Sequence, residues 1–453
     1  MEILSRSEIV SVLLSGPYNR TFDYIICKKE NLKIGQIVLV PFGRQESLGI
    51  IIGKGRNDLP ENKLKKIKYI INLPVMSNFY LNFISFFANW NCADKGNVLK
   101  MILSPFDKQS LKNIDRKNYK EIDGDLCNLK NEKNLKQLNY NQKIASEKVL
   151  QNLKTLASKT FLLDGVAGSG KTETYFEAVK ECIKNDKQVL ILLPEIGLTS
   201  DWELRFYNRF GFKPLVWHSG ITKSKKKKIW LSALNKRKMV LVGARSALFV
   251  PMSNLGLIVI DEEHDISFKQ EEGIRYHARD MAIYLASKSN ASIILSSATP
   301  SIESLYNVKT KKYLLLNLPE RATGSDLPEI RIIDLKKNPP KQGNWLSEEM
   351  LKELTKRYNN NEQSLLFLNR RGYSALTLCK DCGFRIHCNN CNAWLVEHKK
   401  KKVYLCHHCG FKKRITLFCE KCHSTDLVSC GPGIEKINEE VKKSFPNASI
   451  ENI

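Results

Sequence analysis

The sequence predicts an α/β protein of several domains, and three observations lead to this fold class. A glycine-rich loop between an apolar run and a helical segment indicates a parallel sheet with a phosphate site. Short apolar runs near the N-terminus predict a small β-rich domain. Four Cys-x-x-Cys pairs late in the chain predict a metal-stabilised module. With 453 residues, of which 42% are hydrophobic, the chain is long enough for about three domains.

The N-terminal hundred residues are expected to form the β-rich domain. Turn signals at Gly16-Pro17 and Phe42-Gly43 separate the apolar runs. The four runs cover residues 9–14, 22–26, 36–41 and 48–53. The segment 75–103 then predicts helix, ending at Ser104-Pro105.

Residues 106–137 are polar, rich in Lys, Asn and Asp, and lack apolar periodicity. A segment of about thirty such residues cannot bury a core of its own. We therefore expect a linker.

An eight-residue loop carries the clearest chemistry of the chain. It consists of Gly165, Val166, Ala167, Gly168, Ser169, Gly170, Lys171 and Thr172. An apolar run at 160–163 precedes the loop, and helix-forming residues follow it to 183. This order places backbone N–H groups and a helix N-terminus around one polyphosphate. We expect Lys171 to reach the β- and γ-phosphates of ATP, and the Thr172 hydroxyl to ligate Mg²⁺.

A second apolar run, at 255–260, ends in Asp261-Glu262-Glu263-His264. We expect Asp261 to hold Mg²⁺ through water and Glu262 to polarise the attacking water. Such an acidic cluster can also cap the next helix. Its position about ninety residues after a phosphate loop favours the catalytic interpretation.

The Asp-Glu-x-His form and four further motifs resemble the DExH helicases of superfamily 2. The motifs lie at 138–142, 193–199, 243–249 and 297–300. The resemblance implies that the amide of Gln142 binds the adenine edge and that His264 belongs to the catalytic set. It also implies that 193–199 and 243–249 touch the nucleic-acid backbone, and that 297–300 couples ATP hydrolysis to strand movement.

Residues 261–280 are similar to the aromatic-rich loop of the PriA family of primosomal replication-restart helicases. The family commonly has Trp where this chain has Ile274. The resemblance, together with chemistry that suits single strands, implies stacking faces and phosphate partners. The stacking residues are Phe268, Tyr276 and His277, and the phosphate partners are Lys269, Arg275 and Arg279. An ordinary loop with aromatic packing residues is the alternative.

The N-terminal segments Thr21-Phe22-Asp23-Tyr24 and Val40-Pro41-Phe42-Gly43 resemble the PriA domain that captures the 3′ end of a nascent strand. The resemblance implies a pocket of Phe22, Asp23, Tyr24 and Gly43, with Lys65 as a phosphate contact. By residue type alone, Phe22 and Tyr24 are more often strand core residues. The family places a winged-helix domain where 106–137 lies, so this segment is expected to be a linker or a reduced winged helix.

Eight of the 13 cysteines form Cys-x-x-Cys pairs. Two such pairs complete one tetrahedral Zn²⁺ site, so four pairs predict two zinc ions. Of three possible pairings, spacing favours the nested one. Only five residues separate Cys382 from Cys388, whereas the fourteen between Cys391 and Cys406 resemble a zinc-ribbon loop. The PriA family shares this nested pattern. One ion would be held by Cys388, Cys391, Cys406 and Cys409, the other by Cys379, Cys382, Cys419 and Cys422.

Disulfides and an iron–sulfur cluster are the alternatives for these cysteines. The sequence has no N-terminal apolar signal and no run of 18 apolar residues. We therefore expect a cytoplasmic protein without a membrane span, and the resemblance implies association with the nucleoid at forks. The net charge of +25 suits a nucleic-acid partner. The lysine runs at 225–228 and 399–402 can sit near phosphates, although such runs are more often solvated surface.

Residues 364–372 resemble the first strand and turn of a second RecA-like lobe. The zinc module interrupts that lobe, and residues 427–431 and 448–450 supply at most two more strands. A parallel α/β lobe needs about five strands with covering helices. We therefore expect an incomplete second lobe and a chain shorter than the family's full length.

These expectations divide the chain into six parts. They are the 3′-end-binding domain (1–105), the linker (106–137), RecA-like lobe 1 (138–320), a connector with the start of lobe 2 (321–378), the zinc module (379–422) and the continuation of lobe 2 (423–453).

The resemblance implies an ATP-dependent 3′-to-5′ DNA helicase that recognises stalled or collapsed forks and initiates primosome assembly. The implied cofactors are two Zn²⁺ and Mg²⁺, with ATP as substrate. The implied partners are forked and single-stranded DNA, primosome and replication-restart proteins and single-stranded DNA-binding protein, and the chain is expected to be a monomer. With an incomplete second lobe, it is expected to bind ATP and DNA but to unwind poorly. A fork-binding scaffold that recruits replication proteins without unwinding is the alternative, and a RecG-type translocase leaves the cysteine pairs unexplained.

Overall fold

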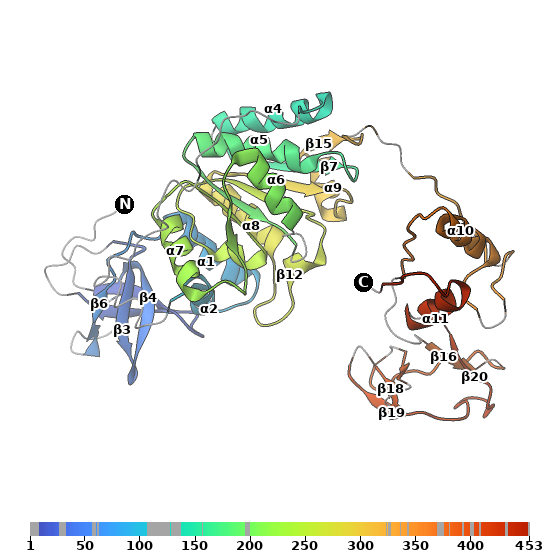
Figure 1. The fold of residues 1–453 in the computed structure, drawn as a ribbon. Helices are drawn as coiled ribbons and strands as arrows, with labels where there is room; N and C mark the ends of the chain where they lie inside the picture. Colours follow the sequence, from blue (N-terminus) through green and yellow to red (C-terminus); the bar gives the residue numbers. More distant parts are fainter. Residues whose placement is uncertain are drawn as a thin grey trace. The chain divides into compact units, whose positions relative to one another are not determined.

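The structure, a computed structural model, divides into two compact units, Met1–Asp326 and Leu327–Ile453 (Figure 1). Each unit has its own hydrophobic core. The described residues are 9–26, 33–56, 60, 63–106, 127, 137–155, 157–194, 200–322, 324, 328–335, 337–341, 344–368, 376–379, 381–391, 394–398, 403–406, 409–430 and 434–451.

The N-terminal part of the first unit is a six-stranded sheet with the order β5-β2-β1-β4-β3-β6. Its strands are β1 (Ile9–Leu14), β2 (Thr21–Ile25), β3 (Ile37–Phe42), β4 (Gln45–Lys54), β5 (Lys65–Lys66) and β6 (Tyr69–Ile70). The four predicted strands are thus confirmed as β1 to β4. Because side chains alternate between the faces of a strand, Val12 and Leu14 pack in one cluster and Leu13 in another. Strand β1 is therefore buried on both faces.

Two helices follow this sheet, α1 (Asn78–Trp90) and α2 (Lys95–Ile102). Both helices lie within the segment 75–103 predicted to be helical, with a break between them. The chain leaves the helix at Asn91, and Cys92 takes a φ of 51°, which a continuous α-helix does not allow.

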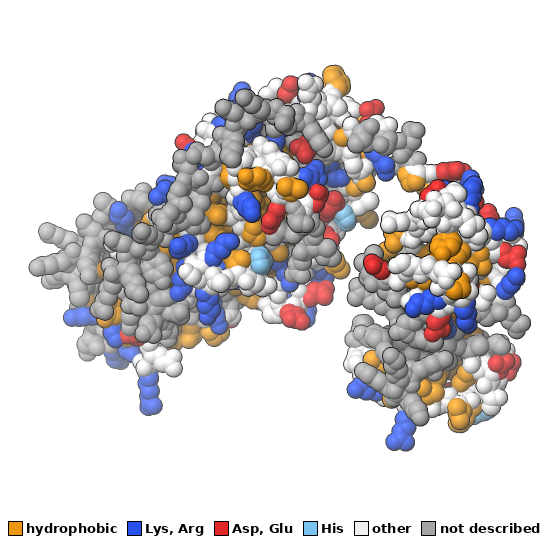
Figure 2. Space-filling model, in the orientation of Figure 1, with side chains coloured by type: hydrophobic (Ala, Val, Ile, Leu, Met, Phe, Trp, Pro, Cys, Tyr) orange, Lys and Arg blue, Asp and Glu red, His pale blue; other side chains and the backbone are white. Residues whose placement is uncertain are grey.

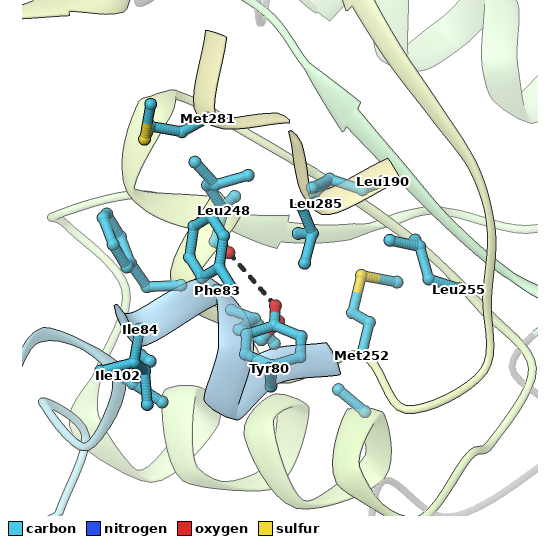
Figure 3. Close-up of a cluster of buried hydrophobic side chains, with 14 of the residues drawn as sticks. Tyr80, Phe83, Ile84, Ile102, Leu190, Leu248, Met252, Leu255, Met281 and Leu285 are labelled. Carbon is cyan, nitrogen blue, oxygen red and sulfur yellow. Dashed lines mark hydrogen bonds between the residues drawn. The ribbon is translucent and has the colours of Figure 1, made fainter. Parts of the chain in front are cut away.

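One side of α1 shares a hydrophobic core with the domain that follows it (Figure 3). Tyr80, Phe83 and Phe87 recur every three or four residues, which places them on one side of the helix, and all three are buried. The ring of Phe87 lies 5.4 Å from that of Phe249 and 5.1 Å from that of Tyr276. The N-terminal helices and the following domain therefore do not have separate cores.

Tyr80 is expected to stabilise this shared core through its hydroxyl group. The hydroxyl donates to the carbonyl of Leu248 at 3.2 Å and to that of Val250, and the residue is 1% exposed. Tyr80→Phe removes the donor and is expected to lower the free energy of unfolding by about 1–2 kcal/mol. Urea unfolding measures the change, beside Tyr140→Phe as a control at a side chain that is 77% exposed. Equal midpoints for both variants would contradict this role.

The middle of the first unit is a seven-stranded sheet with the order β15-β7-β14-β11-β8-β10-β9. Every neighbouring pair is parallel, so all carboxyl ends lie along one edge. The strands are β7 (Thr160–Gly165), β8 (Gln188–Leu192), β9 (Leu215–Trp217), β10 (Met239–Gly243), β11 (Leu255–Asp261), β14 (Ser292–Ser297) and β15 (Leu314–Leu318). The helices are α4 (Tyr140–Thr155), α5 (Lys171–Lys184), α6 (Ser200–Phe210), α7 (Lys223–Leu234), α8 (Ala278–Ser289) and α9 (Ile302–Lys309). Strands β8 and β10 are buried along their whole length, as expected where helices cover both faces of a parallel sheet.

In its described residues, the second unit contains two helices and two small antiparallel sheets. The helices are α10 (Glu348–Asn359) and α11 (Ile434–Ser444), and the strands are β16 (Leu376–Cys379), β17 (Val396–His398), β18 (Val403–Leu405), β19 (Lys412–Arg414) and β20 (Leu427–Cys430). The buried carboxylate of Glu440 on α11 accepts hydrogen bonds from the backbone of Trp345 and Leu346 at 2.7 and 3.2 Å. These bonds tie α11 to the segment that leads into α10.

Two strands predicted for a second lobe do not form in the described residues. Residues 364–368 lack regular structure, and Leu365 and Phe367 are 80% and 84% exposed; residues 369–372 lie outside the described part. Residues 448–450 likewise form no strand. An apolar run becomes a strand only beside a partner strand, and none of the described residues pairs with these runs. The run at 427–431 does form a strand, β20, by pairing with β16.

In the described part of the chain, no helix combines the length and the apolar content that crossing a membrane requires.

Candidate ATP, zinc and DNA sites

The phosphate loop connects β7 to α5 at the carboxyl edge of the parallel sheet. Gly168 and Gly170 have φ values of 79° and 81°, which glycine adopts without strain. A Cβ atom at Gly170 would lie 2.2 Å from the Nε2 atom of Gln142. The backbone thus turns closely into the N-terminus of α5, the arrangement in which N–H groups surround a phosphate.

Lys171 is the first residue of α5 and is 9% exposed. Its Nζ atom donates to the carbonyl of Gly165 at 2.9 Å, so the ammonium group lies against the loop that it is predicted to serve. The chain after β15 also contacts this loop, because the backbone N–H of Ala322 donates to the carbonyl of Gly168 at 2.9 Å. The phosphate loop is therefore stabilised both by its own Lys171 side chain and by the backbone of the segment after β15.

Gln142, predicted to read adenine, is 3% exposed and packs against the same loop. Its Nε2 atom donates to the carbonyl of Ser169 at 2.8 Å. Its Oε1 atom accepts from the backbone of Asn139 at 2.9 Å. The amide thus joins α4 to the phosphate loop, and adenine recognition by Gln142 stays a prediction.

Asp261, the last residue of β11, lies in a hydrogen-bond network that the sequence did not reveal. The Tyr175 hydroxyl donates to one carboxylate oxygen at 2.9 Å and the Ser296 hydroxyl to the other at 2.8 Å. The Tyr175 hydroxyl also accepts from the indole of Trp202 at 3.1 Å. Burial, and next the charge of Asp261, raise the pKa of Tyr175 well above its usual value. The protonated tyrosine therefore helps to hold Asp261, a predicted Mg²⁺ ligand, in position.

The turn after β11 contacts the segment after β14. Glu262 has a φ of 50°, which is uncommon outside glycine and frequent at functional turns. Its carboxylate lies 3.7 Å from the Nδ1 atom of His264. The same Nδ1 atom lies 2.7 Å from the hydroxyl of Ser297, which accepts from the backbone of Thr299 at 2.9 Å. His264 therefore contacts both the turn after β11 and the segment after β14.

Arg279 does not offer its side chain to a phosphate in this structure, which corrects the sequence prediction. It is 8% exposed and pairs with Glu263, which is fully buried, at 2.8 Å. Ser301 completes the network, donating its backbone N–H to Glu263 at 2.7 Å and accepting from Arg279 at 2.7 Å. A buried carboxylate needs such partners, so the arginine is committed to the protein interior.

The predicted stacking platform is also corrected by the structure. Phe268 and Tyr276 are 1% and 5% exposed and belong to the large core, so neither ring presents a face to a nucleic acid. His277 is half-buried, and burial together with Arg279 lowers its pKa, which favours a neutral ring. The reason is tertiary, because helix α1 covers Tyr276 through Phe87.

Two predicted phosphate partners, Lys269 and Arg275, are exposed. They lie on either side of a two-stranded hairpin, β12 (Lys269–Gln270) and β13 (Tyr276–His277). The backbone carbonyl of Lys269 accepts from Arg245 at 3.1 Å. Arg245 begins the segment Arg245–Phe249, one of the predicted nucleic-acid motifs. The motif at 193–199 lies outside the described residues except for Leu193 and Pro194.

The predicted 3′-end pocket is brought together in part. Phe22 packs edge-on against Phe42, with ring centroids 4.9 Å apart. The hydroxyl of Tyr24 donates to the carbonyl of Pro41 at 3.2 Å, and burial raises the pKa of Tyr24 to about 12. The Nζ atom of Lys65 donates to the carbonyl of Gly43 at 3.2 Å. These side chains therefore meet at the turn between β3 and β4.

Asp23 lies on the other face of β2, as the alternation of a strand requires. Its carboxylate accepts from the backbone of Arg56 at 2.8 Å. The structure therefore does not place the Asp23 carboxylate with the other four predicted residues.

The cysteines gather into two groups with the nested pairing. The Sγ atoms of each group lie within 4.8 Å of one another. The groups are Cys379, Cys382, Cys419 and Cys422, and Cys388, Cys391, Cys406 and Cys409. Sulfur pairs across each group are 3.4–3.6 Å apart, too long for a disulfide of about 2.05 Å. The spacing fits a tetrahedron of thiolates about 2.3 Å from Zn²⁺, so the donor set fits two structural zinc sites.

The backbone around the sulfurs forms repeated tight turns. Gly383 and Gly410 follow the second cysteine of their pairs with φ values of 69° and 76°. Their N–H groups donate to the carbonyls of Cys379 and Cys406, both at 3.0 Å. Such turns orient two thiolates to one side, and glycine permits them without strain.

Three family models match separate parts of the chain. Residues 11–104 match the PriA 3′ DNA-binding domain, residues 140–308 the DEAD/DEAH box helicase, and residues 388–414 the cysteine-rich region of the PriA DNA helicase. These matches cover the N-terminal sheet, the parallel sheet with its phosphate loop, and one cysteine group.

Curated relatives are similar over nearly the whole chain. The replication restart protein PriA of Haemophilus influenzae is 35% identical over 98% of this chain and 70% of its own length. The PriA of Rickettsia conorii is 40% identical over 98% of this chain and 66% of its own length. The PriA of Bacillus subtilis is 37% identical over 68% of this chain and 38% of its own length.

The chain thus spans about two thirds of the length of the Rickettsia relative. It carries an ATP-binding helicase domain, a DNA-binding domain and two zinc-binding cysteine sites. On the strength of the identity and coverage, the chain belongs to the PriA family of replication restart proteins.

Proposed function

We propose that this chain is an ATP-dependent 3′-to-5′ DNA helicase that recognises stalled or collapsed forks and initiates primosome assembly. The observation that carries the proposal is that the phosphate loop after β7 and Asp261 at the end of β11 lie at the same edge of the parallel sheet, with Asp261 held by the hydroxyls of Tyr175 and Ser296. This arrangement supports a site that holds the Mg²⁺ and the phosphates of ATP, in a chain that also matches a DNA 3′-end-binding domain.

The ATP chemistry is assigned to residues of the parallel sheet. Lys171 leaves the Gly165 carbonyl to bind the β- and γ-phosphates, while Thr172 and Asp261 hold Mg²⁺. When bound, Mg²⁺ neutralises charge that develops on the phosphate oxygens. Glu262, whose side chain is 43% exposed, orients and deprotonates the attacking water. His264 connects this turn to the Ser297 segment and so links hydrolysis to movement.

The DNA chemistry is assigned to two regions of the first unit. Phe22, Tyr24, Gly43 and Lys65 surround the turn between β3 and β4, where an aromatic face and an ammonium group suit a terminal nucleotide. Lys269 and Arg275 contact phosphates from the hairpin. Forked and single-stranded DNA are therefore the proposed substrates, and replication-restart and single-stranded DNA-binding proteins the proposed partners.

A fork-binding assay tests recognition of the 3′ end. Anisotropy is measured with two labelled forks that differ only in a 3′-hydroxyl or a 3′-phosphate on the nascent strand at the junction. We expect the chain to bind the fork with the 3′-hydroxyl more tightly than the fork with the 3′-phosphate. Lys65→Ala is expected to reduce this difference in affinity. The control variant Lys54→Ala, at an exposed position on β4, is expected to keep it. Equal affinity for both forks contradicts the 3′-end pocket.

ATP-driven strand displacement separates a helicase from a scaffold. The labelled nascent strand is released by a helicase only with hydrolysable ATP, and Glu262→Gln abolishes release while fork binding persists. If the wild-type chain binds the fork but releases no strand, the scaffold is the better description.

A further inference from the structure

The N-terminal half of helix α7 carries an unusual concentration of positive charge. Its sequence is KSKKKKIWLSAL over Lys223–Leu234. Lys223 and Lys225 are exposed, and Lys226 and Lys228 are partly exposed. None of these four forms an ion pair with another described residue. In the space-filling view, Lys and Arg side chains gather over the part of the face where α7 lies (Figure 2).

Local stability does not account for this charge. The N-terminus of a helix carries a partial positive charge and favours acidic side chains, but the first turn of α7 has none. Lysines three residues apart, as at 223/226 and 225/228, also repel one another on a helix surface. The lysine run therefore destabilises helix α7, unless a negatively charged partner offsets the repulsion.

The lysines stand on a rigid support. The hydroxyl of Thr222 caps α7 by accepting from the backbone of Lys225 at 3.3 Å. The other half of the helix is buried. There the indole of Trp230 donates to the carbonyl of Ile102 at 2.9 Å and packs against Phe106. The charged end is consequently held in a fixed position on the first unit.

The sheet topology places this end beside the predicted nucleic-acid motifs. Strand β9 ends at Trp217, which is in register with Gly243 at the end of β10. The chain enters α7 from β9 and enters the segment of Arg245 from β10, both at the carboxyl edge. Lys226 lies over the ring of Trp217, 5.8 Å from its centroid. Arg245 in turn donates to the backbone carbonyl of Lys269 at 3.1 Å, so the segment after β10 also contacts the hairpin.

We propose that Lys223, Lys225 and Lys226 bind the phosphate backbone of single-stranded DNA and extend the DNA contact along the carboxyl edge of the parallel sheet. The proposal deepens the proposed function and rests on it. A phosphate chain fits because it supplies a row of negative charges that match several flexible ammonium groups. It leaves the phosphate loop free, because the four strands β14, β11, β8 and β10 separate β7 from β9 in the sheet.

Salt dependence of binding provides the test. The logarithm of the association constant of a single-stranded oligonucleotide falls with the logarithm of salt concentration, with a slope of about −0.7 for each phosphate contact. The triple variant Lys223→Gln, Lys225→Gln, Lys226→Gln is expected to make the slope less negative by about 2. The matched control is Lys309→Gln, Lys311→Gln, Lys312→Gln, three exposed lysines that lead into the amino end of β15 at the opposite edge.

The outcomes distinguish failure of DNA binding by the chain from failure of the α7 contact alone. If the wild-type chain does not bind the oligonucleotide, the proposed DNA function fails. If it binds and the α7 variant keeps the wild-type slope, only the α7 contact is overturned. Equal changes in both variants also overturn it, because they reflect net charge rather than position. Circular dichroism of the α7 variant checks that the helix persists, and Lys→Arg at the same three positions should keep the wild-type slope.

Discussion

Lys171→Ala is expected to abolish ATP binding at micromolar nucleotide. The ammonium group is nearly buried against the phosphate loop, where water competes weakly. Each charge-assisted hydrogen bond contributes about 1.5–3 kcal/mol, so losing two of them weakens binding about 100-fold or more. Titration with a fluorescent ATP analogue measures this change. Lys184→Ala, at an exposed position on the same helix, is the matched control and should bind as the wild type does.

Glu262→Gln, in contrast, should keep the nucleotide affinity and lose hydrolysis. Among the described residues, the Glu262 side chain forms no hydrogen bond with the phosphate loop. Its proposed role is to activate the attacking water. Removing a general base slows a reaction by about 10²–10⁴-fold. Loss of nucleotide binding in this variant to the same extent as in Lys171→Ala would show that Glu262 has a different role.

Cys388→Ser is expected to release one of two zinc ions and to unfold the surrounding module. Cys388 is 7% exposed and lies in a small core with Leu395 and Tyr404, so the metal and the core support one another. Structural zinc supplies about 10–16 kcal/mol of folding free energy in small domains, which this core does not replace.

Elemental analysis should find two zinc ions in the wild type and one in the variant, with faster proteolysis near the module. Cys92→Ser, at an exposed cysteine of the first unit, should keep both ions. A wild-type stoichiometry near one, or the visible absorbance of an iron–sulfur cluster, would rule out two separate zinc sites.

Local patterns in the sequence predicted the strands and turns of the site well. The run before Gly165 and the run before Asp261 form buried strands because continuous apolar residues suit a sheet covered on both faces. The cysteine pairing followed from loop length, which limits how chain segments can reach one metal. In both cases the decisive contacts involve residues close in sequence, or a spacing that has few solutions.

Exposure of the aromatic-rich loop could not be predicted in the same way. Whether Tyr276 faces solvent depends on Phe87, which lies far earlier in the chain and packs against it. Arg279 resembles a phosphate ligand by type, yet the neighbouring Glu263 binds it in the interior. Residue type gives the chemistry available to a side chain, and tertiary packing decides where that chemistry acts.

The contact between Tyr175 and the predicted Mg²⁺ site could have been predicted from the position of Tyr175 in the sequence. Tyr175 lies three residues after Thr172 on α5, and side chains at this spacing share one side of a helix. A tyrosine on the same side as a predicted Mg²⁺ ligand is a candidate partner for it. The strand predicted at 364–368, in contrast, could not be tested from the sequence, because no local pattern reveals whether a partner strand is present.

The most direct test of the account is the rate of ATP hydrolysis with and without forked DNA. The proposed ATP site and DNA contacts lie in one unit, and His264 joins the turn after β11 to Ser297. We predict that saturating fork DNA raises the hydrolysis rate of the wild-type chain, that Glu262→Gln shows no hydrolysis under either condition, and that His264→Ala hydrolyses ATP without responding to DNA. A wild-type rate that is the same with and without DNA would contradict the account.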